Sequence, residues 1–244
     1  MQTESPSSKL KREARTRISG VLMPVIIASV LWFAISVIIQ LLTNELSGLS
    51  KITTEINAAI TSGSPMYSYD LIDALRRFGS IPGSLLSLAL SVCSAVIGTG
   101  FTWFTLRVAR GDKPDYKSLF DGFTRFGRVL WLCILKSVIV SVCAFFFVVP
   151  GIVMWFRYSM AIRICYDNPD FSAVKCLKES ARLMRGLKVE YLTLGFSFAG
   201  WFMLGIAAAF LIGVSVTDIW LNVYAGVTAS LFYDAAVAAD SSSR

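Results

Sequence analysis

The sequence contains no histidine. This absence excludes imidazole bases, Ser-His and Cys-His dyads, and most catalytic zinc sites. The five cysteines form no Cys-x-x-Cys pair, so neither a disulfide framework nor a metal cluster is expected. A Gly-x-Ser-x-Gly nucleophile elbow is also missing. We therefore expect a protein that is not an enzyme and that uses no cofactor or metal.

Charged residues are scarce as well, at 16% of the chain against 55% hydrophobic residues. The apolar residues gather in long runs, which is typical of an integral membrane protein. The net charge of +7 would ordinarily suggest nucleic acid as a partner. Here, however, lysine and arginine cluster in short loops beside the apolar runs, as the positive-inside rule describes. Anionic lipid is the expected partner, and nucleic acid is not.

The apolar runs predict an all-α fold, a polytopic membrane bundle of six transmembrane helices. We expect one membrane domain over 19–239, between a basic cytoplasmic tail at 1–18 and a short tail at 240–244. The first run is too long for a signal peptide and no cleavage site follows it. The predicted spans are 21–42, 81–106, 129–149, 152–166, 191–214 and 219–238.

The charges between the runs predict the orientation. The connection 44–80 is slightly acidic and is expected outside, with short outer turns at 149–151 and 215–218. Both termini are then cytoplasmic. The loop after 81–106 is expected inside because it is rich in basic residues, namely Arg107, Arg110, Lys113, Lys117, Arg125 and Arg128.

The run 152–166 has only about fifteen residues, fewer than the ~17 to 25 of a usual spanning helix. A re-entrant hairpin is therefore an alternative. The basic segment 167–188 argues for a full span, because a hairpin that failed to cross would leave these charges outside.

The segment 167–188 has the pattern of a helix that lies on a membrane surface. Its apolar stripe consists of Phe171, Val174, Leu177, Ala181, Met184 and Leu187. Beside the stripe lie Lys175, Lys178, Arg182 and Arg185, the predicted site for anionic lipid. Alternatively, these charges serve only to hold the loop inside.

A weaker copy of this segment occurs at 112–128, where Asp112-Lys113-Pro114-Asp115 matches Asp167-Asn168-Pro169-Asp170. We expect a second cytoplasmic amphipathic helix there. The copy indicates either parallel hairpin repeats or a common way to begin a helix, with proline and acids in the first turn.

Ionisable side chains inside the spans are the default functional candidates, because burying them in lipid is costly. Because the partners of each pair would lie at similar depths in the membrane, we predict the ion pairs Arg157 with Asp218 and Lys136 with Asp234. The alternatives are that Asp218 caps a helix and that Lys136 extends to the surface, as Arg163 is expected to do.

Two polar ridges complete the list of candidates. The last span contains Asn222, Gly226, Ser230 and Asp234 at i+4 spacing, and span 81–106 has a small-residue seam that includes Ser87 and Ser91. If the ridges enclose water they form a solute path, and if they interlock they hold helices together.

Several short motifs resemble a bacterial family of membrane proteins, domain of unknown function 975. More distantly, the chain resembles the membrane domain of some glycerophosphodiester phosphodiesterases. The resemblance implies a multi-span protein of the bacterial plasma membrane and supplies no activity. Its residues are Arg110-Gly111, 119–123, 149–152, Tyr158, 167–169, Ser180, 184–188, Phe198, Trp201 and Phe232-Tyr233.

The sequence thus predicts a non-enzymatic accessory or scaffold component that engages anionic lipid. A protein partner or a second copy of the chain is a further candidate for binding. The alternative is a small-solute or ion transporter or channel that uses the two polar ridges.

Overall fold

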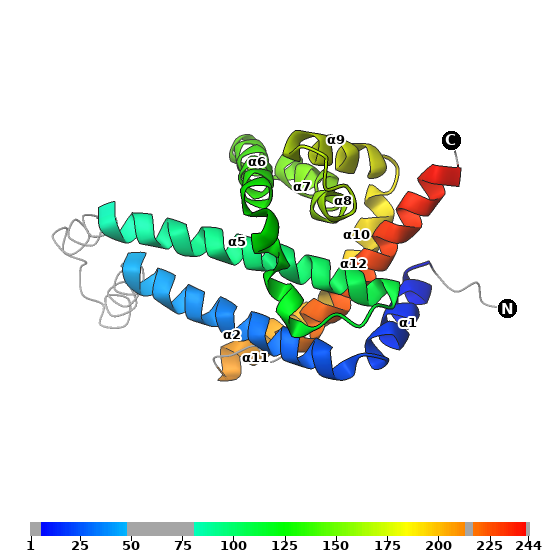
Figure 1. The fold of residues 1–244 in the computed structure, drawn as a ribbon, viewed down its shortest axis with the longest axis horizontal. Coiled ribbons are helices and arrows are strands. Elements are labelled where there is room, and N and C mark those ends of the chain that lie inside the picture. The colour runs from blue at the N-terminus through cyan, green and yellow to red at the C-terminus, as the bar shows by residue number, and fades with distance from the viewer. Residues whose placement is uncertain (1–5, 48–80, 213–216, 243–244) are drawn as a thin grey trace. The chain divides into compact units, whose positions relative to one another are not determined.

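The computed structural model describes residues 6–47, 81–212 and 217–242, and every regular element in this part of the chain is a helix (Figure 1). The chain divides into two compact units, Met1–Phe33 with Val96–Arg244, and Ala34–Ala95. The sequence analysis predicted a single membrane domain over 19–239, and this stays a prediction. The sites discussed below all lie in the first unit, apart from Ser87 and Ser91.

Three helical stretches are long and apolar enough to cross a membrane: Leu22–Glu45, Leu85–Arg110 and Tyr116–Phe146. A fourth is added if Lys188–Phe196 and Ala199–Ala208, which meet at a bend of 41°, form one span. Large apolar side chains are exposed along these helices, for example Ile38 at 56% and Val138 at 53%. Since such surfaces are stable in lipid rather than in water, the chain is a membrane protein.

The second unit contains the end of α2 (Leu22–Ser47) and the start of α5 (Ile81–Arg110). These two helices correspond to the predicted spans 21–42 and 81–106. Most of the predicted outer connection between them, 48–80, lies outside the described residues.

The predicted span 152–166 is two short helices rather than one. Helix α6 (Phe126–Phe146) ends at the extended residue Phe147, and α7 (Val148–Arg157) begins directly after it. The turn is therefore earlier than the predicted 149–151. Gly151 permits it, because a Cβ there would lie 2.6 Å from Cβ of Ala144 on the facing helix. A short turn then leads to α8 (Ala161–Asp167).

The predicted N-terminal tail contains a helix, α1 (Pro6–Ser19), which packs against α12 (Thr217–Ser242) and α10 (Lys188–Phe196). Its side chains Ala14 and Ile18 are fully buried. Nζ of Lys11 donates a 2.7 Å hydrogen bond to the carbonyl of Ser197 and lies 4.2 Å from the ring centre of Phe198. A cation at this position satisfies a carbonyl that the bend has freed from its helix. Burial lowers the pKa of Lys11.

The same bend separates α10 (Lys188–Phe196) from α11 (Ala199–Ile212), which together replace the predicted span 191–214. The last helix, α12 (Thr217–Ser242), continues through most of the predicted tail 240–244. It is not among the candidate spans. Helices α1, α9 (Ala173–Leu183) and α11 pack against it, so α12 can bury polar residues that lipid would not accept.

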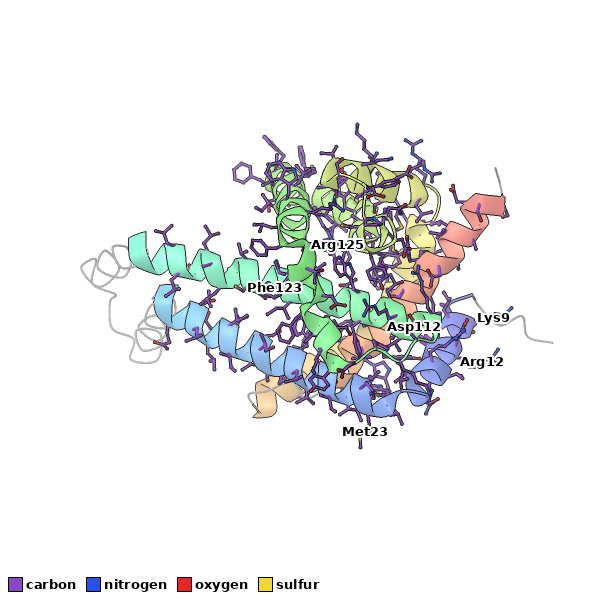
Figure 2. The ribbon with its side chains drawn as sticks, in the orientation of Figure 1. Lys9, Arg12, Met23, Asp112, Phe123 and Arg125 are labelled. Atoms are coloured by element: carbon purple, nitrogen blue, oxygen red, sulfur yellow. The ribbon has the colours of Figure 1, made fainter. Side chains whose placement is uncertain are left out.

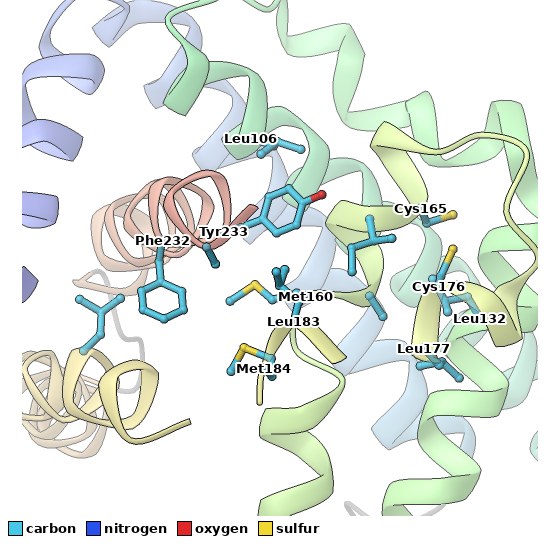
Figure 3. Packing of buried hydrophobic residues seen from close by; sticks show 14 of the residues in the cluster. Leu106, Leu132, Met160, Cys165, Cys176, Leu177, Leu183, Met184, Phe232 and Tyr233 are labelled. Carbon is cyan, nitrogen blue, oxygen red and sulfur yellow. The ribbon is translucent and has the colours of Figure 1, made fainter. Parts of the chain in front are cut away.

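The core joins helices that are far apart in the sequence. Figure 3 shows Leu106 of α5, Leu132 of α6, Cys165 of α8 and Tyr233 of α12 around Met160, which precedes α8 and is fully buried. Helix α9 (Ala173–Leu183) contributes buried residues to the same cluster.

A close crossing fixes the 3₁₀ helix η1 (Tyr116–Arg125) against α5. Asp115 caps η1 by accepting a 2.8 Å hydrogen bond from the amide of Tyr116. Gly100 of α5 faces the backbone of Leu119, and Gly122 faces the backbone of Val96. Figure 2 shows Phe123 and Arg125 on this element, which corresponds to the predicted amphipathic helix 112–128.

This crossing predicts that Gly100→Ala destabilises the protein, because the new Cβ would overlap the carbonyl of Leu119. We expect a loss of about 1 to 3 kcal/mol, measured as a lower melting temperature in detergent. The matched control is Gly98→Ala on the same helix, where no described atom lies within 4 Å of the added Cβ. The crossing is wrong if the two variants melt alike.

Candidate functional site

Helix α9 occupies the middle of the predicted surface segment 167–188. It is shorter than predicted because Ser172 caps it, accepting a 3.3 Å hydrogen bond from the amide of Lys175. Its apolar side, including Cys176 and Leu177, is buried against α6 and α8. The predicted stripe therefore packs mainly within the protein, although Val174 is 44% exposed.

The basic side of α9 divides into three environments. Nζ of Lys175 lies 3.6 Å from the ring centre of Phe171. Arg182 forms 2.6 Å ion pairs with Glu179 and with Asp240 of α12. The hydrogen bonds from Arg182 to Asp240 and Glu179 raise the pKa of its guanidinium.

The remaining two basic residues, Lys178 and Arg185, are exposed. No described carboxylate forms an ion pair with either of them within the 4.0 Å limit. Lys178 of α9 and Arg185, which follows the end of α9, therefore have no ion-pair partner among the described residues.

A groove of about 610 Å³ lies between α6, α7 and α9. Its charged lining combines Lys178 and Arg182 of α9, Arg185 directly after α9, and Arg157 of α7, together with Glu179. Nε of Arg157 is buried and has no hydrogen-bond partner among the described residues. The apolar lining includes Leu135, Ile139, Val174, Leu177 and Ala181.

Arg157 therefore lies beside α9. The depth of Arg157 in its predicted span did not indicate this neighbour. The hydroxyl of Ser180 donates a 2.9 Å hydrogen bond to the carbonyl of Arg157, which fixes the end of α7 to α9. The predicted partner, Asp218, has a side chain outside the described residues, so the pair Arg157 with Asp218 stays a prediction.

The predicted pair Lys136 with Asp234 is wrong, because Asp234 binds Arg110 instead. Nη2 of Arg110 lies 2.8 Å from Asp234, and its guanidinium also makes two bonds of 2.7 and 2.8 Å to Asp167. The hydroxyl of Tyr233 donates a 2.8 Å hydrogen bond to the same carboxylate of Asp167. This Arg110 cluster joins the ends of α5 and α8 to α12.

Arg107, one turn before Arg110, forms a second connection. Its guanidinium lies 2.9 Å from the carboxylate of Asp121 on η1 and donates a 2.8 Å hydrogen bond to the hydroxyl of Tyr166 on α8. Basic residues that were predicted to fix the orientation therefore also hold helices together.

Arg163 is a functional candidate that the sequence reasoning missed. It was expected to extend to the surface, but its side chain is buried, with only 6% exposed. Its Nε donates a 3.1 Å hydrogen bond to the hydroxyl of Ser230, and Nη2 lies 3.4 Å from the carbonyl of Gly226. The i+4 ridge of α12 was the available signal, since it offers these acceptors on one face.

The two polar ridges meet at one described position. Gly226 lies so close to α5 that a Cβ there would be 2.9 Å from Cγ2 of Thr105. Asn222 is exposed. Ser91 donates a 2.9 Å hydrogen bond to the carbonyl of Ser87 in its own helix, and both belong to the other unit.

No described group of three or more acidic or cysteine side chains is arranged to hold a metal ion. Among the described residues, charged groups instead join helices, and arginine is the common donor.

Ser230→Ala should destabilise the protein, because it removes the acceptor of a buried guanidinium. We expect a cost of about 1 to 3 kcal/mol, read from thermal unfolding in detergent. The control is Thr228→Val, which removes a buried hydroxyl whose one bond among the described residues goes to the carbonyl of Tyr224 in the same helix. Equal losses in both variants would contradict a special role for the contact between Arg163 and Ser230.

Comparison with known proteins gives one match. No curated protein and no solved structure matches the chain. The matched family model covers residues 147–240, which includes α8, α9 and most of α12. The more distant resemblance to phosphodiesterase membrane domains stays a prediction. Residues 147–240 match the family model described as "Protein of unknown function (DUF975)".

Proposed function

We propose that this membrane protein is a non-enzymatic accessory or scaffold component of the bacterial plasma membrane that engages anionic lipid at its cytoplasmic face. The observation that carries the proposal is the convergence of Arg157, Lys178 and Arg185 without described acidic partners in one groove. Each basic residue near an anionic leaflet contributes about 1 kcal/mol.

The positive-inside rule supports the orientation. Basic residues gather at the end of α5 and along α9, and the proposed topology places these segments and both termini inside. In the same proposal, α7 together with α8 forms one span and α12 forms the last of six spans. A protein partner or a second copy of the chain on this face is compatible with it.

Transport of a small solute or ion is the weaker alternative. A solute path needs polar groups that are available to water or an ion. On the ridge of α12, the hydroxyl of Ser230 is bound to Arg163 and the carboxylate of Asp234 is bound to Arg110. These contacts favour the role of holding helices together.

The test is the lipid that remains bound after purification in a mild detergent. We expect phosphatidylglycerol and other anionic lipids to be enriched over their share of the host membrane, as measured by lipid mass spectrometry. The triple variant Lys175→Gln, Lys178→Gln, Arg185→Gln should lose most of the enrichment, because these three cations are neutralised. A matched control is Lys9→Gln with Arg12→Gln on α1. The proposal fails if the wild type retains lipids in the proportions of the host membrane.

A further inference from the structure

We infer that the groove between α6, α7 and α9 is a site for one anionic phospholipid rather than part of a diffuse basic surface. The headgroup phosphate would lie among Arg157, Lys178 and Arg185, and an acyl chain would follow Leu135 and Ile139 of α6. The inference rests on the proposed function and names the place and the ligand class.

The charge of the groove is the first reason. Four cationic side chains line it together with one acid, Glu179. That carboxylate is 2.6 Å from Arg182, which Asp240 also binds, so this pair is already neutralised. Arg157, Lys178 and Arg185 leave the groove with a net positive charge, which complements a phosphate.

Arg157 gives the second reason for a phospholipid site in this groove. Nε of Arg157 has no acceptor among the described residues, and buried donors of this kind nearly always find one. The main chain of Arg157 is held in place by Ser180, so its side chain starts from a fixed position at the groove. Nε itself is closed to solvent, so what Arg157 offers a phosphate is its positive charge at the groove lining, which no described carboxylate neutralises.

The apolar wall is the third reason, and it decides between a lipid and a free anion. Leu135 and Ile139 line the groove from α6, which belongs to the candidate span Tyr116–Phe146. On the same helix Ile134 and Val138 are 42% and 53% exposed, so the groove borders a surface suited to acyl chains. An inorganic anion would gain nothing from this wall, whereas a lipid buries its chain there.

The experiment measures binding of phosphatidylglycerol to the full-length protein by native mass spectrometry, with phosphatidylcholine as the reference lipid. Lys178→Gln and Arg185→Gln should each weaken binding about fivefold, which corresponds to ~1 kcal/mol per cation. Arg157→Gln should weaken it by a similar factor, because Arg157 lines the groove and forms no described ion pair. Lys175→Gln is the matched control, since Lys175 is on the same helix but does not line the groove, and it should change binding less than twofold.

The outcomes separate the site from the general function. If Lys175→Gln weakens binding as much as Lys178→Gln, attraction is diffuse, and the site is refuted while the proposed function stands. If the wild type does not prefer phosphatidylglycerol, both fail. Displacement of the lipid by millimolar inorganic phosphate would identify a free-anion site and refute the lipid. Lys178 is exposed, so its variant tests the site even if Arg157→Gln does not fold.

Discussion

The bridge from Arg110 to Asp167 and Asp234 is the interaction on which the arrangement of the first unit most depends. One guanidinium binds two carboxylates from segments far apart in the sequence. The hydroxyl of Tyr233 donates a further hydrogen bond to Asp167. Bidentate contacts of this kind fix direction as well as distance. The side chains are each about one-quarter to one-third exposed, at 34%, 24% and 32%, so the bridge is only partly screened by solvent.

The remaining polar contacts repeat this pattern. Arg163 crosses from α8 to Ser230 of α12, Arg182 crosses from α9 to Asp240, and Lys11 reaches from α1 to the bend at Ser197. In each case a cation from one helix meets an oxygen of another. Most of the basic residues near α12 are therefore committed to the fold. Lys178, Arg185 and Arg157 stand apart from this pattern, and for that reason they carry the proposed function.

The sequence predicted the all-helical class and the long apolar helices α2, α5 and α6 correctly, because length and hydropathy decide whether a helix suits a bilayer. The number of six spans stays a prediction. The sequence did not predict how 152–166 is divided, since the one-residue turn at Phe147 depends on the contact of Gly151 with Ala144. It also assigned the apolar side of α9 to the membrane surface, because an amphipathic pattern is the same whether lipid or protein covers it. The partner of Asp234 was wrong for a related reason: depth along a helix does not specify which neighbour faces it.

The most direct test of the helix-joining role is a double-mutant cycle between Arg110 and Asp234, with unfolding measured in mixed detergent micelles. The variants are Arg110→Gln, Asp234→Asn and the pair together. The structure predicts a coupling energy of about 1 to 2 kcal/mol, against roughly 0.3 to 0.5 for the exposed pair Arg17 with Glu13. A coupling between Arg110 and Asp234 no larger than that of the exposed pair would contradict the account.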